Sequence, residues 1–326
     1  MTQQQGTRTR GRIKKWLLLS LKAIGIIALL FLVFCAVVYT VNKVSSHAEQ
    51  KKLVPYGQHV TVDGKQMNLY IQGEGEQTIV MLPGFGTASP ALDFKPLIDE
   101  LSPDYKVVVV EPFGYGLSDR TDKERDTRTI VHEIHTALQS LEIDRYILMG
   151  HSISGLYSLD YVNQYPDEVT AFVGLDSSVP TISEQKIDSS ATTPVKWFRD
   201  LGFARIQVKL GDDPYDELPY DASTKEQLKI LTHKNMYNTT QLNEIEQMYD
   251  NFQSAQQQAF PPELPVLLFV QAQHPTMDQW VPEHEKQIQH SIHAQMVLLE
   301  GDHYLHRTHA KEIKASLSEF MAILQP

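Results

Sequence analysis

The sequence predicts an α/β protein in which a mostly parallel sheet carries helices on both faces, preceded by a separate apolar segment at the N-terminus. Apolar runs of strand length alternate with helical segments over most of the chain. One such run ends in a turn of small residues with a serine at its centre. The chain has 326 residues, of which 42% are hydrophobic and 21% charged, so it can bury a large core.

Charge is distributed unevenly along the chain. The formal net charge is −11, yet residues 1–48 hold seven Lys and Arg and no acidic residue, so the remainder carries −18. Nucleic-acid binding needs a basic face for phosphates. The acidic body therefore argues against a nucleic-acid partner.

The N-terminal segment is predicted to enter a membrane. The 19 residues from 23 to 41 carry no charge, which is enough for a helix to span a bilayer core, whereas a secretory signal core has about 7–15 residues. We expect a basic tail over residues 1–15 and a transmembrane signal anchor over 16–42. Five basic residues precede the span and three follow it, which predicts a single-pass protein with a cytoplasmic N-terminus and an extracytoplasmic body.

Two other interpretations of this segment remain open. Ser46-His47-Ala48 has small residues at which a signal peptidase could cleave after Ala48, and the run could also be a buried core helix. Cys35, within the span, is the only cysteine. The body therefore has no intramolecular disulfide, no cysteine-based metal cage and no catalytic thiol.

A linker over residues 43–56 is expected to lead into one domain over residues 57–326. Residues 59–62 and 66–71 alternate apolar and polar side chains around Asp63-Gly64, which predicts an antiparallel hairpin at a sheet edge. The following strands are nearly continuous apolar runs, as expected for strands covered on both faces. Strands are predicted at 78–82, 106–110, 146–149 and 171–175, and helices at 94–101, at 127–141 and from the serine turn to 165.

The alternation stops over residues 180–262 and then resumes. This stretch reads as helices with an acidic loop at 211–221, and 194–210 carries Trp197 and Phe198 on an apolar stripe. We interpret 180–262 as a lid inserted over the site, although the stripe equally suits ordinary helix packing. Beyond it, strands are predicted at 266–270 and 294–299, and helices at 282–292 and 309–324.

The serine turn has the composition of a nucleophile elbow. Strand 146–149 is followed by Gly150-His151-Ser152-Ile153-Ser154 and then by a helix. A tight turn of this kind needs small residues two positions either side of the nucleophile, and it places the next backbone N–H at a helix N-terminus. Ser152 is the predicted nucleophile and Ile153 N–H the first oxyanion donor. Ser154 stands where the pattern usually has Gly, and an ordinary strand-to-helix turn is the alternative.

Two further strand ends supply candidate partners. Residues 82–87 form a glycine-containing loop after the first parallel strand, in which Phe85 N–H is the predicted second oxyanion donor. His303 follows the last strand, and it is the predicted general base for Ser152. Without this context, either feature is more typical of an ordinary loop.

The acidic partner of His303 has two candidates. A carboxylate must lie behind the imidazole to fix its tautomer, and the loop after strand 266–270 offers Asp278, 25 residues before His303. Asp176, at the end of strand 171–175, could reach the same histidine from the neighbouring strand. The sequence analysis favours Asp278, although this residue lies later in its loop than expected.

Together these motifs resemble the α/β-hydrolase family over residues 52–326. The resemblance rests on Leu82-Pro83-Gly84-Phe85-Gly86, on residues 111–119 after the next strand, on Gly150 to Gly155, and on Gly301-Asp302-His303. It implies an eight-stranded, mostly parallel sheet, a lid after the sixth strand and the chain order Ser, acid, His. The departures from the family pattern are Pro83 in place of His, Ser154 in place of Gly, and the displaced acid.

These residues predict a membrane-anchored serine hydrolase that cleaves a carboxylic ester through an acyl-enzyme on Ser152. The expected substrate is a small or lipid-like ester, and no metal or cofactor is needed. Amide, thioester or carbon–carbon cleavage by the same residues, or a non-catalytic binding or scaffold role on the same fold, are the alternatives. A serine nucleophile at position 152 disfavours the dehalogenases and epoxide hydrolases of the same family, which attack with Asp. The histidines at 303, 306 and 309 recur every three residues, but their run crosses a loop into a helix start and lacks an obvious carboxylate partner for a metal. His132 and His135 are one residue short of the zinc-protease spacing.

Overall fold

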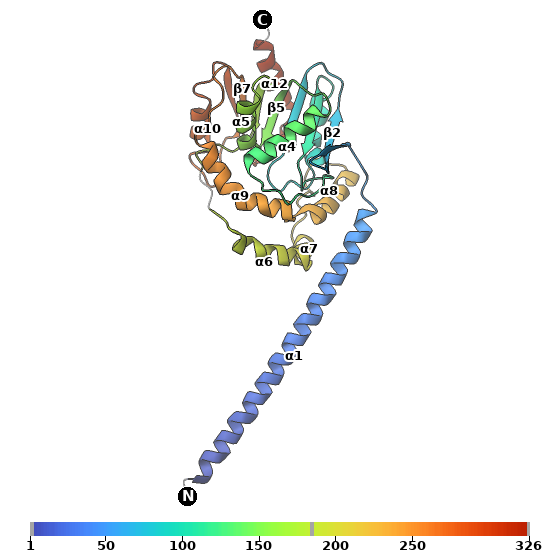
Figure 1. Cartoon of the computed structure of the whole chain (residues 1–326), viewed down its shortest axis with the longest axis vertical. Helices are drawn as coiled ribbons and strands as arrows, with labels where there is room; N and C mark the ends of the chain where they lie inside the picture. The colour runs from blue at the N-terminus through green and yellow to red at the C-terminus, as the bar shows by residue number, and fades with distance from the viewer. Residues whose placement is uncertain (1–2, 183–185, 325–326) are drawn as a thin grey trace.

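A single eight-stranded sheet forms the centre of the body in a computed structural model, which describes residues 3–182 and 186–324, with side chains from residue 14 onward. The strand order is β1-β2-β4-β3-β5-β6-β7-β8 (Figure 1). Pairs β1·β2 and β2·β4 are antiparallel, and the other neighbours are parallel. The predicted fold class is confirmed. The strands are β1 (Gln58–Val62), β2 (Lys65–Gln72), β3 (Thr78–Leu82), β4 (Lys106–Glu111), β5 (Tyr146–His151), β6 (Val169–Leu175), β7 (Val266–Gln271) and β8 (Ala294–Leu299).

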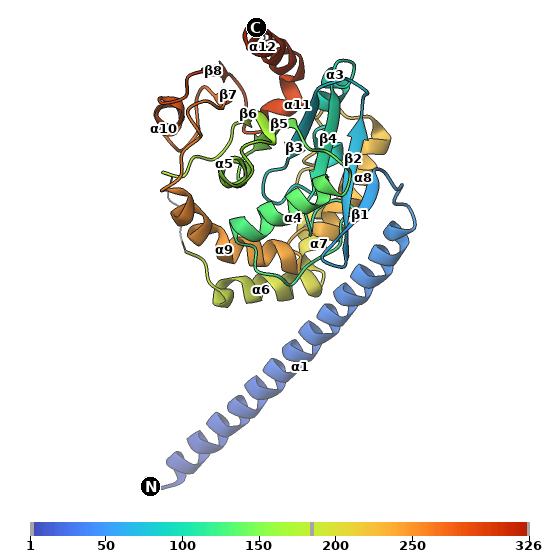
Figure 2. The ribbon, with the colours of Figure 1, turned by 45° about the horizontal axis from the view of Figure 1, so that its top comes forward.

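Both faces of the sheet are covered, which explains the continuous apolar runs. In β3, Ile79 and Met81 pack into the core on one face and Val80 and Leu82 into the core on the other, and all four are fully buried. Figures 1 and 2 show helices on both sides of the strands. One core includes side chains of α4 (Thr127–Gln139), α5 (Ser154–Gln164) and α10 (Trp280–Ile288), and the other includes side chains of α2 (Pro90–Asp93), α3 (Lys95–Leu101), α11 (Leu305–Thr308) and α12 (Ala310–Ile323).

Four helices are inserted between β6 and β7, within the stretch where the alternation was predicted to stop. They are α6 (Ser189–Asp200), α7 (Phe203–Leu210), α8 (Ala222–Asn235) and α9 (Thr239–Ala255). They form two tiers, with α8 and α9 beside the body and α6 and α7 farther out (Figure 1). Asn238 and Asn251 fix the inner tier, because their side chains form hydrogen bonds with the backbone of Gly114 and Arg125 in the loop after β4 and of Thr127 at the start of α4.

The N-terminal segment forms one long helix, α1 (Gln3–Gln50), which projects from the body (Figure 1). It is long and apolar enough to cross a membrane, with a mean hydropathy of 2.8 over its most apolar 18 residues, of which 6% are buried. The helix continues through residue 50, so the first half of the predicted linker is helical. This extension is held by the buried Arg205 of α7, which donates hydrogen bonds to Asn42 (2.9 Å), Ser46 (3.0 Å) and Glu49 (2.5 and 2.8 Å).

Candidate active site

Ser152 occupies a strained turn between β5 and α5. Its φ of 54° lies in the left-handed region, which is uncommon for a residue with a side chain. The turn is crowded, since a Cβ added at Gly150 would lie 2.8 Å from Ser158 Oγ. The half-buried Ser152 thus has the backbone geometry of the predicted nucleophile elbow.

Ser154 has a specific function in this turn, which explains why it can replace glycine. Its hydroxyl donates a 2.5 Å hydrogen bond to the carbonyl of Pro83, in the loop after β3. The next residue, Gly84, approaches so closely that an added Cβ would lie 2.7 Å from His151 Nδ1 and 3.1 Å from Ser152 Cβ. The glycine-containing loop is therefore fastened directly against the serine turn.

The two predicted oxyanion donors belong to these two adjoining turns. Phe85 follows Gly84, and Ile153 follows Ser152 at the start of α5. Among the described residues, neither Phe85 N–H nor Ile153 N–H donates a hydrogen bond to a protein acceptor. Unpaired backbone donors beside a serine are the arrangement that can stabilise a developing oxyanion.

His303 is paired with Asp176. Its Nδ1 lies 2.6 Å from Asp176 Oδ2, and the carboxylate is fully buried. The other oxygen, Oδ1, accepts hydrogen bonds from Gln271 N–H (2.8 Å) and Trp280 Nε1–H (2.7 Å). Because Nδ1–H is donated to Asp176, Nε2 of His303 carries the lone pair that can accept a proton.

The preference for Asp278 does not match this geometry. Asp278 is exposed, and the partner of His303 is Asp176, at the end of β6, which the sequence analysis ranked second. The end of β7 and the start of α10 contribute hydrogen-bond donors to the carboxylate, through Gln271 and Trp280, instead of the carboxylate itself. The available signal was the position of Asp176 directly after an apolar strand, where parallel strand ends converge.

His151 is a site residue that the sequence analysis did not identify. It is buried, and its Nε2 lies 3.1 Å from the backbone carbonyl of His303, with the two rings 4.8 Å apart. Burial, reinforced by the charges of His306 and His303, holds the pKa of His151 well below its usual value. A neutral His151 therefore donates its Nε2–H to the backbone of His303. This hydrogen bond connects the loop that carries His303 to the end of β5, directly before Ser152.

A second buried cluster supports the same loop. Asp93 Oδ2 lies 2.8 Å from His306 Nε2, and Arg307 donates two hydrogen bonds to Asp93 Oδ1 (2.6 and 3.0 Å). Burial acts to raise the pKa of Asp93, but His306 and Arg307 outweigh it and lower this pKa to about 2. The histidines at 306 and 309 thus have separate partners, since His309 contacts Glu312 and the carbonyl of Glu300.

Glu244 of α9 connects the insertion to both turns of the site. It is buried and accepts a 2.7 Å hydrogen bond from the hydroxyl of Tyr157 on α5 and another 2.7 Å bond from Tyr115. Tyr115 in turn accepts a 3.4 Å hydrogen bond from Gly86 N–H, beside Phe85. Burial raises the pKa of Glu244, against the opposing effect of these hydroxyls. One carboxylate therefore positions the elbow helix and the glycine-containing loop.

The sheet order, the serine turn and the pairing of His303 with the buried Asp176 define an α/β hydrolase. The profile of the alpha/beta hydrolase fold family matches residues 77–310, and the chain belongs to this family.

Several relatives resemble the chain. The Bacillus subtilis protein YbdG, whose function is uncharacterised, is 30% identical over 260 residues, which cover 78% of this chain and 80% of that protein. The karrikin insensitive 2 receptor CA of Petunia hybrida is 32% identical over 115 residues, or 34% of this chain and 42% of the receptor. An epoxide hydrolase structure from Bacillus megaterium superposes with a TM-score of 0.62 at 19% identity, covering 81% of this chain and 100% of that one, which shows the common fold.

Proposed function

We propose that this protein is a serine hydrolase that cleaves a carboxylic ester through an acyl-enzyme on Ser152. The observation that carries the proposal is the left-handed φ of 54° at Ser152 together with the 2.6 Å contact between His303 and the buried Asp176. A strained serine turn near a histidine that a carboxylate orients is the arrangement that serine catalysis requires.

The reaction follows from the roles of these groups. Ser152 Oγ attacks the acyl carbon while Nε2 of His303 takes its proton, and Asp176 stabilises the resulting imidazolium. Phe85 N–H and Ile153 N–H hold the oxyanion. His303 then returns the proton to the departing alkoxide, which leaves as an alcohol. Water, deprotonated by the same imidazole, attacks the acyl-enzyme, releases the carboxylic acid and restores Ser152.

The proposal includes a membrane location for this chemistry. We infer that residues 16–42 cross the bilayer with the N-terminus in the cytoplasm, so that the body lies outside. The exposed apolar surface of α1 supports this arrangement. A body held against a bilayer suits a lipid-like ester, and a preference for long acyl chains over short ones is the expected specificity.

The test is covalent labelling of the detergent-solubilised chain with a fluorophosphonate probe. Wild type is expected to label at Ser152, Ser152→Ala to remain unlabelled, and the matched control Ser291→Ala to label like wild type. Matched ester, thioester and amide substrates with the same acyl group then identify the bond, and a higher kcat/KM for the amide or the thioester would contradict ester specificity.

The second candidate is a binding protein on the same fold. The petunia relative is named as a receptor, which favours this candidate, although the match covers 34% of the chain. A pocket that only binds needs no reactive serine. Folded wild type that does not label with the probe would replace the hydrolase proposal with this one.

A further inference from the structure

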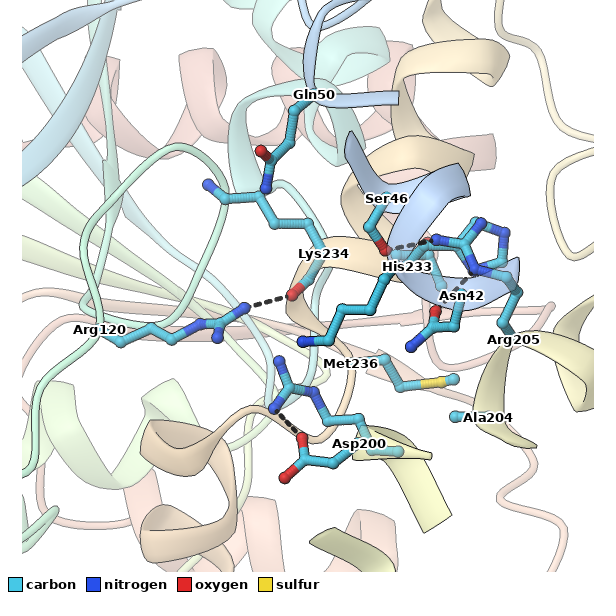
Figure 3. A pocket seen from close by; sticks show the side chains of 13 residues that line it. Asn42, Ser46, Gln50, Arg120, Asp200, Ala204, Arg205, His233, Lys234 and Met236 are labelled. Atoms are coloured by element: carbon cyan, nitrogen blue, oxygen red, sulfur yellow. Dashed lines mark hydrogen bonds and ion pairs between the residues drawn. The ribbon is translucent and has the colours of Figure 1, made fainter. Parts of the chain in front are cut away.

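A cationic cavity lies where α1 meets the insertion. Its volume is about 200 Å³, and Figure 3 shows side chains from α1, from the loop after β4 and from the insertion around it. We call it the junction cavity. Its lining residues with charged side chains are Lys43 of α1, Arg120 of the loop after β4, Arg199, Asp200 and Arg205 of α6 and α7, and Lys234 of α8.

Positive charge in the junction cavity exceeds negative charge. Arg205 is neutralised by Glu49, and Arg199 Nη1 lies 3.1 Å from Asp200 Oδ1. Among the described residues, the ammonium groups of Lys43 and Lys234 and the guanidinium of Arg120 have no carboxylate within ion-pair distance. An excess of this kind stands out in a body whose residues 49–326 carry a net charge of −18.

Backbone carbonyls hold two of these cations in place. Arg120 donates a 2.6 Å hydrogen bond to the carbonyl of Lys234, and Lys234 Nζ donates a 2.8 Å bond to the carbonyl of Gly116. Burial, reinforced by the charge of Arg199, lowers the pKa of Arg120. Burial also lowers the pKa of Lys234, with the charge of Glu111 opposing this effect. A bound anion would stabilise the charged forms of Arg120 and Lys234 and so offset the free-energy cost of their burial.

The cavity lies at the end of the apolar run of α1. Four of its lining residues, at positions 42, 43, 46 and 50, lie on the part of α1 that continues beyond Val41, the last residue of that run. Phe203 of α7 packs on Phe34 with ring centroids 6.1 Å apart. Phe34 precedes Val41 by seven residues, a rise of about 10 Å along the helix. If the apolar run lies in hydrocarbon, the start of α7 lies at the same depth, and the cavity lies at the level of the headgroups.

The outer tier of the insertion also exposes apolar side chains beside the cavity. Trp197 is 65% exposed and Leu210 is 82% exposed, although both belong to amphipathic helices of the body. Phe198 stacks on Phe203 at 5.7 Å, so this surface is continuous with the apolar surface of α1. Aromatic and aliphatic side chains of this kind suit the boundary between headgroups and acyl chains.

We propose that the junction cavity binds the phosphate of an anionic phospholipid in the leaflet at the C-terminal end of α1. This inference rests on the membrane insertion of residues 16–42 proposed above. Arg120, Arg199 and Lys234 contact the phosphate, and the acyl chains lie along α1 and the outer tier. A zwitterionic choline headgroup brings its own cation into the cavity, where these side chains repel it, so the preference is for a lipid with net negative charge.

The test measures lipid retention by the full chain and does not depend on catalysis. The protein is reconstituted in nanodiscs of equal parts phosphatidylcholine and phosphatidylglycerol, released into mild detergent, and its retained lipids are counted by native mass spectrometry. Wild type is expected to retain phosphatidylglycerol selectively. Arg120→Gln with Arg199→Gln should lower this selectivity about fivefold for each cation removed. The control, Arg128→Gln with Lys311→Gln, removes two exposed cations elsewhere and should behave like wild type.

Folding and the source of the phosphate are checked separately. Thermal unfolding of each variant shows that it is folded, and titration with inorganic phosphate reports soluble anions. Equal phosphatidylglycerol retention by wild type and the cavity variant overturns the proposal. Stabilisation by millimolar inorganic phosphate without any lipid selectivity overturns the lipid source in favour of a soluble phosphate. Fluorophosphonate labelling of Ser152 is unaffected by either result, so it judges the hydrolase proposal independently.

Discussion

Asp176 shows how much of a carboxylate's position depends on contacts that are distant in sequence. Its three hydrogen-bond donors come from β7, from α10 and from the loop after β8. Asp176 and Asp278 both follow parallel strands that are neighbours in the sheet, so sequence order could not rank them. The sequence could single out Ser152 and His303 because each belongs to a short motif that directly follows a predicted strand. The acid has no such local motif.

Replacement of Asp176 is expected to disable the site. Asp176→Asn preserves the shape but changes the hydrogen bond to His303 and its tautomer, so kcat should fall by about 10⁴-fold. Asp278→Asn, in an exposed loop position, is the matched control and should stay within about twofold of wild type. Single-turnover acylation rates with an ester substrate measure both. An acylation rate of Asp176→Asn within about twofold of wild type would remove Asp176 from the mechanism.

His151 is expected to make stability depend on pH. Its pKa is depressed in the folded chain, so below its unfolded value of about 6.5 the unfolded state binds the extra proton. Stability is therefore present above about pH 6.5 and declines as the pH falls. His151→Asn keeps a donor for the carbonyl of His303 but cannot titrate, so the decline should be shallower by about 1 kcal/mol per pH unit.

Denaturant unfolding between about pH 5 and 7.5 measures this slope. His306, whose pKa burial also lowers, remains in the variant and keeps part of the pH dependence. Identical slopes in wild type and His151→Asn would show that folding does not lower the pKa of His151.

At the scale of elements, the strands were predictable and the arrangement of the insertion was not. Predicted strand 78–82 coincides with β3, because a strand buried on both faces reads as an unbroken apolar run. The stretch 180–262 was predicted to contain helices, but their packing depends on buried polar contacts such as Glu244 with Tyr115 and Tyr157. Polar contacts between distant segments have no periodicity from which a sequence could reveal them.

Glu244→Ala should weaken both the fold and the site. Two buried tyrosine hydroxyls lose their acceptor, so the free energy of unfolding should drop by about 3 kcal/mol. The loop at Gly86 loses its support through Tyr115, so fluorophosphonate labelling of Ser152 should slow by about tenfold in the variant that remains folded.

Asp250→Ala provides the control on the same helix, since Asp250 is exposed and forms an ion pair with the exposed Lys186. It should change stability by no more than about 0.5 kcal/mol. Glu244→Ala that labels at the wild-type rate would show that the glycine-containing loop holds its geometry without α9.

At the scale of the whole molecule, the end of α1 is part of the body's packing. A chain shortened to begin at Asn42 keeps all the partners of Arg205, whereas one that begins at Lys52 leaves this buried guanidinium without Asn42, Ser46 and Glu49. The shorter chain should be less stable by about 2 kcal/mol, with a Tm lower by about 5 °C. Thermal unfolding of the two shortened chains is the measurement, and equal Tm values would contradict it.

The orientation of the chain can be tested with single cysteines in a Cys35→Ser background. The positive-inside bias predicts that a membrane-impermeant maleimide labels Glu74→Cys in intact cells, because Glu74 is exposed on the body. Thr7→Cys should label only after the cells are lysed. Labelling of Thr7→Cys in intact cells, with protection of Glu74→Cys, would reverse the proposed orientation.

The helix α1 is unbroken up to the residues that pack against α7 of the insertion. The body is therefore joined to the N-terminal segment by a stiff helical stalk instead of a flexible tether. A tethered domain sweeps a volume around its anchor and tumbles within it. A domain on a stalk keeps one height and one tilt relative to the plane that holds it. As such a protein diffuses laterally, its active site stays at one distance from that plane and encounters the molecules found at this distance. If residues 16–42 cross a bilayer as proposed above, Ser152 meets molecules of that membrane far more often than those in the surrounding solution.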